Sequence, residues 1–426
     1  MLLFILVVLL LTTGCGKKDS PVAVDNGPLP KQDVASAEFE SAGQCQYCHL
    51  EIFEQWQGSM HALSYKNPAF LAVYEQTSRE SDGASDQFCA SCHAPVGWLA
   101  NEIPPADGSG LSQIAREGVT CDLCHTITEV VAQKNAAFRV EPGKIKFGPF
   151  ADPLETPLHK SEFNQIYTRS EYCGACHNIV HPKNKLPLSS TYSEWKESSF
   201  NSKKIMCQDC HMTPGPGVTK PNPGVAATGA PKKREHISTH YMSGGNVFAM
   251  RQAGFDKHAS LAEEQLKAAA SLFLGLPEKV GPFQPTNVNV RIRNDGAGHY
   301  LPTGLTTFKD MWLEVVVTDG GGRVIYQNGV LDSQGKIPAN SVVFKTTFAD
   351  ADGNETSNLW EAAKILADHR IPPQQYVDEY IEIPGVPVPG VLKVQVRLLY
   401  RRGTHVAQSE PIEMAKVAGQ LTVSSP

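Results

Sequence analysis

Ten of the eleven cysteines in this 426-residue chain form C-x-x-C pairs, and a histidine directly follows each pair. The five motifs span residues 45–49, 89–93, 121–125, 173–177 and 207–211. Random placement of cysteine and histidine at their observed frequencies predicts about 0.01 such motifs. C-x-x-C-H is the attachment signature of c-type haem, in which two thiols bind one porphyrin and the histidine binds its iron. The sequence therefore predicts five covalently bound c-type haems.

The motifs assign two roles to their residues. The predicted haem thioethers are Cys45, Cys48, Cys89, Cys92, Cys121, Cys124, Cys173, Cys176, Cys207 and Cys210, and the predicted proximal iron ligands are His49, His93, His125, His177 and His211. The alternative is zinc or disulfides, but zinc sites combine two such pairs per ion and need no histidine after each. Because the thioethers leave only Cys15, we expect no disulfide.

The N-terminus predicts export. Residues 2–11 are an uninterrupted apolar run, which is too short to span a bilayer and is typical of a signal peptide. Residues 11–15, Leu-Thr-Thr-Gly-Cys, resemble a bacterial lipoprotein cleavage box, in which Cys15 becomes the lipidated first residue. The alternative, that Cys15 is discarded within a signal peptide, lacks a nearby A-x-A-like cleavage site. Gly16 is the residue type associated with onward sorting to the outer membrane.

The expected organisation is a lipoprotein-type signal peptide (1–14), a tether (15–42), a pentahaem domain (43–255), a connecting helix (256–283) and a β-sandwich (284–426). The haem domain is rich in glycine and proline and poor in long periodic runs, so its core must come largely from the porphyrins. The expected location is the bacterial periplasm or outer membrane, or the cell surface. With 38 basic and 44 acidic residues, the chain offers no electrostatic attraction to nucleic acid.

The fold class is α+β: a mainly helical and irregular haem domain followed by an antiparallel β-sandwich. A capping box at Ser260–Glu263 predicts a helix that ends at Gly275. Residues 287–293 and 392–398 alternate apolar and polar side chains, as half-buried strands do. Residues 312–326 predict a hairpin, and a short inserted helix is expected near 360–366. Residues 350–354 favour a hairpin turn over a calcium loop, whose glycine would stand elsewhere.

Nine histidines outside the motifs are candidates for the second axial position. A second imidazole makes the iron low-spin and keeps its potential low. The six of them whose surroundings in the sequence support this role are His61, His159, His181, His236, His240 and His299. The alternatives are a surface position, a loop cap for His236, a solvent-exposed turn for His181 and an interdomain hydrogen bond for His299. His258, His369 and His405 have no supporting context and are expected at the surface.

A partial repeat links two motifs. Trp56-Gln-Gly-Ser-Met-His61 follows the first, and Trp195-Lys-Glu-Ser-Ser-Phe200 follows the fourth, with Phe200 in place of the histidine. Met206 and Met212 flank the fifth motif, where packing is a more common role than iron ligation.

Residues 45–61, 118–125, 173–178 and 207–212 resemble the multihaem c-type cytochromes related to the nitrification tetrahaem cytochrome and the pentahaem nitrite reductases. The chain looks especially like exported cytochromes of metal-reducing and anaerobic bacteria, and residues 298–304 and 368–373 look like their accompanying β domain. The resemblance implies electron transfer along stacked haems, with His61, His159 and His240 as distal ligands. The nitrite reductases have a lysine after one C-x-x-C pair, whereas all five motifs here end in histidine.

Three functions are consistent with the sequence. The favoured one is a lipid-anchored electron carrier, not an enzyme, which relays electrons from respiratory donors to an outer-membrane or extracellular acceptor through redox-protein partners. The second is a haem reductase that uses one open haem site on a small nitrogen or sulfur oxyanion. The third is self-assembly into a cytochrome filament.

Overall fold

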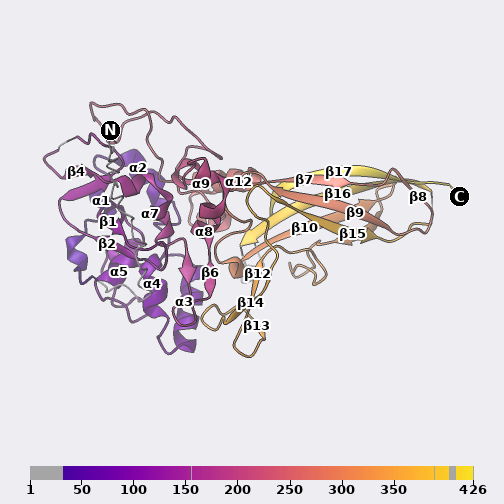
Figure 1. Ribbon diagram of the computed structural model, residues 1–426, viewed down its shortest axis with the longest axis horizontal. Helices are drawn as coiled ribbons and strands as arrows, with labels where there is room; N and C mark the ends of the chain where they lie inside the picture. Colours follow the sequence, from indigo (N-terminus) through magenta and orange to yellow (C-terminus); the bar gives the residue numbers. More distant parts are fainter. Residues whose placement is uncertain (1–31, 155, 388, 403–408, 426) are drawn as a thin grey trace, which may run out of the picture. The chain divides into compact units, whose positions relative to one another are not determined.

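The structure, a computed structural model, describes residues 32–154, 156–387, 389–402 and 409–425 (Figure 1). The described residues from Gln32 onward belong to one compact unit. The predicted signal peptide, the lipidation site Cys15 and His405 lie outside the described residues. Among those that are described, no helix has both the length and the apolar character needed to cross a membrane.

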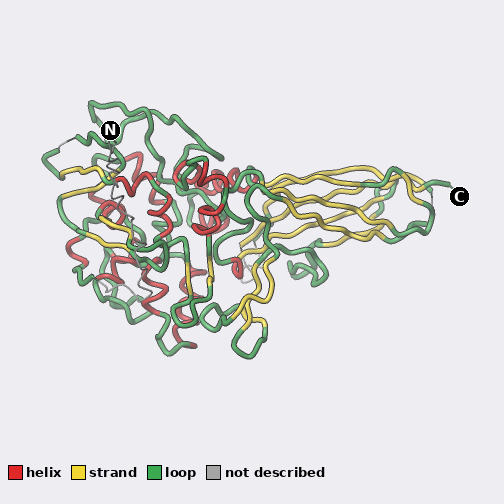
Figure 2. The backbone as a smooth tube through the Cα atoms, in the orientation of Figure 1, coloured by secondary structure: helices red, strands yellow, loops and turns green. Residues whose placement is uncertain are grey.

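The N-terminal part consists of short helices and irregular loops, as expected (Figure 2). Its helices are α1 Ala42–Cys45, α2 Leu50–Gln57, α3 Pro68–Glu80, α4 Asp86–His93, α5 Pro95–Leu99, α6 Cys121–His125, α7 Ser170–Gly174, α8 Thr191–Glu197, α9 Ser199–Ser202, α10 Gln208–His211 and α11 Val247–Gln252. Four 3-10 turns complete the helical elements: η1 Ser36–Glu38, η2 Ala115–Glu117, η3 Gln165–Thr168 and, in the C-terminal part, η4 Thr306–Phe308. Small ladders pair β1 Ile127–Val130 with β2 Phe138–Val140, β3 Ile145–Gly148 with β4 Lys160–Phe163, and β5 Ile179–Val180 with β6 Pro187–Ser189.

The largest cluster of buried apolar residues in this part lies beside motif cysteines. Tyr74, Leu99 and Ile103 are almost fully buried in it, and Cys89 and Cys92 pack against its edge. The polypeptide therefore forms a modest core of its own, with motif cysteines along its boundary.

The connecting helix is shorter than predicted. Helix α12 spans Asp256–Lys267, and residues Ala270–Gly275 form strand β7 instead of continuing the helix. Strand β7 pairs with β9, Thr286–Asn294, so that Leu272 lies opposite Ile292. The helical prediction for 268–275 was wrong because pairing with a distant strand outweighed the local helical pattern.

The C-terminal part is the predicted sandwich. One sheet has the order β11-β10-β16-β17-β8, and the other has the order β15-β9-β7. The other strands of these two sheets are β8 Lys279–Val280, β10 Lys309–Thr318, β11 Val324–Asn328, β15 Tyr376–Ile383, β16 Gly390–Arg402 and β17 Ile412–Val423. Alternate side chains from both sheets, such as Val290 and Val315, share one fully buried core, which is the burial pattern of a sandwich. The pairings are antiparallel except that of β8 with β17.

Two local predictions in the sandwich part had opposite outcomes. The hairpin of β10 and β11 is confirmed, with Val317 opposite Tyr326. The prediction of a short helix near 360–366 was wrong. Residues Lys364–Asp368 form strand β14, which pairs with β12, Thr346–Ala349. Residues 350–354 form the expected hairpin turn between β12 and β13, Glu355–Thr356, closed by the Asp350 amide donating to the Asn354 carbonyl at 2.9 Å.

Candidate haem sites

Each motif adopts a turn that sets the direction of its histidine. The amide of His49 donates to the carbonyl of Cys45 at 2.9 Å, and the fourth and fifth motifs repeat this bond at His177 and His211. This helical turn places the first cysteine and the histidine on one face. A thiol and an imidazole of each such motif can therefore reach the same porphyrin.

Four motif histidines have a fixed ring orientation. Their Nδ1–H groups donate to backbone carbonyls: His49 to Ala226 (2.7 Å), His93 to Ser64 (3.0 Å), His125 to Phe147 (2.7 Å) and His211 to Ser243 (2.6 Å). A proton on Nδ1 leaves the Nε2 lone pair available to a metal, and the carbonyl holds the ring in place. This arrangement fits the proximal ligand of a haem.

Four of the six predicted distal candidates lie opposite a motif histidine. The ring centroids are 6.3 Å apart for His49 and His159, 6.4 Å for His125 and His240, 6.0 Å for His177 and His61, and 6.1 Å for His211 and His299. A metal–nitrogen distance of about 2 Å on each side, plus about 1 Å from each nitrogen to its ring centre, gives roughly 6 Å. The spacing therefore matches two imidazoles on one iron.

Three of the four opposing rings are also shown to be in the required protonation state. Burial lowers the pKa of His61 to about 4, that of His240 to about 3 and that of His299 to about 4. Their rings are therefore neutral near pH 7, which is the form that binds metal. The Nδ1 atoms of His61 and His240 are buried without a hydrogen-bond partner, so these rings are not held by protein contacts alone.

The second motif differs from the others. The ring of Phe70 stacks on that of His93, with centroids 3.8 Å apart and planes 5° from parallel. Within the described ranges, no histidine ring faces His93 as the other four motif histidines are faced.

The other two candidates have different surroundings. His181 is buried, its Nε2–H donates to the Trp360 carbonyl at 3.0 Å, and its Nδ1 accepts from the Lys183 amide at 3.2 Å. His236 accepts from the Asn222 amide at 3.2 Å. The structure brings neither ring opposite a motif histidine.

His258 was expected at the surface, and that prediction was wrong. Its side chain is buried and its Nε2–H donates to the Gln55 carbonyl at 2.7 Å. A Cβ at Gly58 would lie 2.5 Å from the ring, so a glycine is needed there. His258 thus joins α12 to the end of α2.

Contacts between cysteines show which motifs are neighbours. Three pairs of thiols from different motifs are close enough for each thiol to shift the pKa of the other: Cys45 with Cys121, Cys92 with Cys176 and Cys173 with Cys207. The first motif therefore adjoins the third, and the fourth adjoins both the second and the fifth. The ten motif cysteines, all of which lie in the described residues, form no disulfides in this structure.

Comparison with known proteins gives one family match and one match over most of the chain. Residues 44–126 match the family described as cytochrome c554 and c-prime. The penta-heme cytochrome c552 from Thermochromatium tepidum is similar over 90% of this chain and 99% of its own, at 21% identity and a TM-score of 0.64. The two chains share a fold, in which a helical part is followed by a mainly β-sheet part.

Matches to other solved structures are weak. They include the sporulation control protein Spo0M from Bacillus subtilis, at 9% identity and a TM-score of 0.18 over 37% of this chain and 50% of that one. A putative superoxide reductase from Thermotoga maritima has 12% identity and a TM-score of 0.19 over 38% of this chain and 90% of that one. Similarity at this level supports no conclusion about function. A search of the curated proteins found no match.

Proposed function

We propose that this chain, a multihaem c-type cytochrome, binds five haems and passes single electrons between them. Each haem supplies an iron that alternates between the ferrous and ferric states. The observation behind the proposal is the set of four imidazole pairs with centroids 6.0 to 6.4 Å apart. A histidine on each side of an iron would let that iron change oxidation state without a change of ligands, as an electron carrier requires.

The proposed axial ligands follow from these pairs. His159 serves the haem of the first motif, His240 that of the third, His61 that of the fourth and His299 that of the fifth. Backbone carbonyls orient four of the motif histidines, and burial keeps His61, His240 and His299 neutral. Two imidazoles give a lower potential than an imidazole and a thioether, so we propose a low-potential carrier.

The thiol contacts supply a route for the electrons. The first motif adjoins the third, and the second and fifth adjoin the fourth. We propose that the haems of adjoining motifs are stacked on one another. The third and fourth motifs are also close enough for Cys124 to raise the pKa of Cys173 electrostatically. Together these contacts connect all five motifs.

The test is low-temperature electron paramagnetic resonance of the oxidised protein, with haems counted by mass. We expect five haems and at least four low-spin irons. Each variant His61→Ala, His159→Ala, His240→Ala and His299→Ala should convert one iron to high spin. The matched control His181→Ala should leave the spectrum unchanged, and unchanged spectra in the first four variants would reject the ligand assignment.

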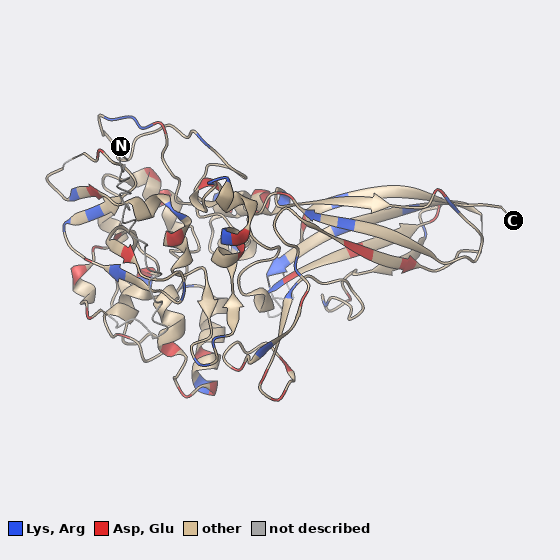
Figure 3. Ribbon diagram, in the orientation of Figure 1, with Lys and Arg blue, Asp and Glu red and all other residues tan. Residues whose placement is uncertain are grey.

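We further propose that the protein is exported, lipid-anchored through Cys15 and active between periplasmic donors and an outer-membrane or extracellular acceptor. The support is the sequence of residues 2–15 and the compartment in which c-type cytochromes are typically found. Acidic and basic residues are interspersed along the ribbon in both parts of the chain (Figure 3). Lipidation predicts that the wild type partitions into detergent and that Cys15→Ser does not.

The second motif favours one alternative, a haem enzyme with an open iron. Phe70 covers one face of the His93 ring, and no histidine of the described chain faces it. In that case one iron is high-spin and binds cyanide in the wild type. Because His405 lies outside the described residues, His405→Ala tests whether it is the missing ligand, and an open iron predicts that this variant changes neither property. If all five irons are low-spin and cyanide does not bind, the enzyme proposal fails and the carrier remains.

A further inference from the structure

The β-sandwich part contributes one of the four opposing histidines. His299 lies in the loop between β9 and η4, far along the chain from the C-x-x-C-H motifs, yet its ring is 6.1 Å from that of His211. The two rings are 15° from parallel. The position of this loop therefore decides whether His299 can reach the iron of the fifth motif.

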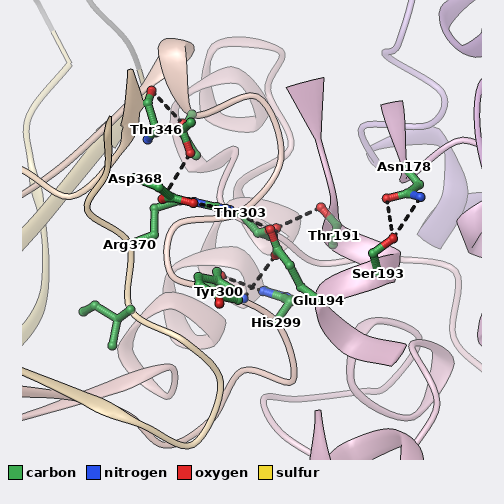
Figure 4. A network of polar contacts seen from close by, with 12 residues as sticks. Asn178, Thr191, Ser193, Glu194, His299, Tyr300, Thr303, Thr346, Asp368 and Arg370 are labelled. Atoms are coloured by element: carbon green, nitrogen blue, oxygen red, sulfur yellow. Dashed lines mark hydrogen bonds and ion pairs between the residues drawn. The ribbon is translucent and has the colours of Figure 1, made fainter. Parts of the chain in front are cut away.

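A buried carboxylate holds that loop. Glu194, on α8, is only 5% exposed, and its Oε2 accepts from the Tyr300 amide at 3.1 Å and from the Thr303 hydroxyl at 2.6 Å (Figure 4). Its other oxygen, Oε1, lies 2.6 Å from Nη1 of Arg370. Glu194 thus accepts hydrogen bonds from Tyr300, the residue after His299, and from Thr303, near the end of the same loop.

The partners of Glu194 come from the sandwich part and are themselves fixed. Arg370 makes two further bonds to the Asp368 carboxylate, at 2.7 and 2.8 Å, and stacks over the Tyr300 ring. Its side chain is 11% exposed. A buried carboxylate whose donors leave is strongly destabilised, so Glu194 and the loop are satisfied only when they are in contact.

Two further contacts brace the loop against the haem part. The hydroxyls of Thr191 and Thr303 lie 2.9 Å apart. A Cβ added to Gly298 would lie 3.0 Å from the Phe200 ring, so the backbone before His299 approaches α9 as closely as glycine allows. Phe200 occupies the position that His61 holds in the first copy of the repeat, and His299 is beside it.

We infer that Glu194 is a positioning residue, which holds the loop of the sandwich part so that His299 can ligate the haem of the fifth motif. The inference rests on the proposed ligand pair His211 and His299. It makes the sandwich a structural component of a haem site. Loss of the Glu194 contacts would open one iron while leaving the covalent haems in place.

The experiment uses the full haem-loaded protein and compares Glu194→Ala, Glu194→Gln and His299→Ala with the wild type. Low-temperature electron paramagnetic resonance measures the high-spin fraction, and mass spectrometry counts the haems. We expect Glu194→Ala to move about one iron in five to high spin, as His299→Ala does, and Glu194→Gln to move a smaller share. The matched control is Glu197→Gln, because Glu197 is exposed on the same helix and should have no effect.

Added imidazole distinguishes a displaced ligand from a damaged haem. In Glu194→Ala it should restore the low-spin signal, since an external ring can occupy the position that His299 has left. A high-spin signal that imidazole leaves unchanged would overturn the inference, because the defect would then lie in the haem itself.

The two proposals fail in different ways. If His299→Ala converts one iron and Glu194→Ala converts none, the positioning role is rejected and the ligand assignment stands. If His299→Ala has no effect, the ligand pair itself is rejected. Should the Glu194 variants not load haem, the variants Thr303→Val and Arg370→Met each remove one of the three Glu194 contacts from the sandwich side, and a wild-type spectrum in both and in the double variant would reject the inference.

Discussion

His61 follows the helix of the first motif in sequence, but its ring faces His177 of the fourth motif at a centroid distance of 6.0 Å. The planes of the two rings are 62° apart, whereas the other three pairs are within 29° of parallel. In the proposed ligand set, the segment after one haem motif therefore completes the site of another. Such an exchange would tie distant segments of the chain together through the haems.

The pairing of His61 with His177 predicts a non-additive effect on spin state. His61→Ala and His177→Ala should each perturb one iron, and the double variant should still perturb only one, because both rings serve the same haem. The control pair is His61→Ala with His49→Ala, which should perturb two irons. Integrated electron paramagnetic resonance signals measure both, and additive losses in the first pair would contradict the assignment.

Removing the indole hydrogen bond of Trp56 should destabilise the haem part. The Trp56 side chain is 6% exposed, and its Nε1–H donates to the Val119 carbonyl at 2.9 Å. Trp56→Phe leaves that carbonyl without its donor, which costs about 1–3 kcal/mol. Denaturant unfolding measures the loss. Tyr47→Phe, at a residue that is 78% exposed, should change the stability by less than about 0.5 kcal/mol.

The buried ion pair of the sandwich predicts a larger effect. Nε of Arg401 lies 2.8 Å from Oδ2 of Asp310, and their side chains are 7% and 12% exposed. Asp310→Ala leaves a buried guanidinium without its partner and should cost about 3–5 kcal/mol. Glu75→Ala, which breaks a surface pair with Arg79, should cost about 0–1 kcal/mol. Equal losses for the two variants would show that Arg401 finds water or another partner.

The pair of His369 and Glu379 predicts a pH dependence. Their side chains meet at 2.8 Å, and the hydrogen bond to Glu379 raises the pKa of His369 above its usual value of about 6.5. A raised pKa in the folded state stabilises the fold fully below about pH 6.5, and this contribution is lost as the pH rises through the higher folded value. His369 is half exposed, so screening keeps the effect below about 1 kcal/mol.

The measurement is the difference in unfolding free energy between the wild type and His369→Gln. It should be largest below about pH 6.5 and should shrink as the pH rises from there through the higher folded pKa of His369. Glu379→Gln, which removes the partner and keeps the histidine, should abolish the dependence. If the difference in unfolding free energy grew with pH instead, the pKa of His369 would be lowered in the folded state and the prediction would be wrong.

Local patterns predicted the elements whose structure depends on neighbouring residues. The C-x-x-C-H motifs predict attachment residues because thioether formation and proximal ligation need only one turn of chain. The alternation at 287–293 predicts β9 because an amphipathic strand buries alternate side chains. The same kind of reasoning failed at 268–275 and 360–366, where strands β7 and β14 form by pairing with partners far along the chain.

The sequence by itself predicted where haem attaches and showed that histidines are available for the second ligand. Only the tertiary structure decided that His61 faces the fourth motif, that a sandwich loop held by Glu194 brings His299 to the fifth, and that His258 is buried. The physical reason is that a covalent motif is encoded within five consecutive residues. An opposing ring, in contrast, is placed by the packing and buried hydrogen bonds of segments from both parts of the chain.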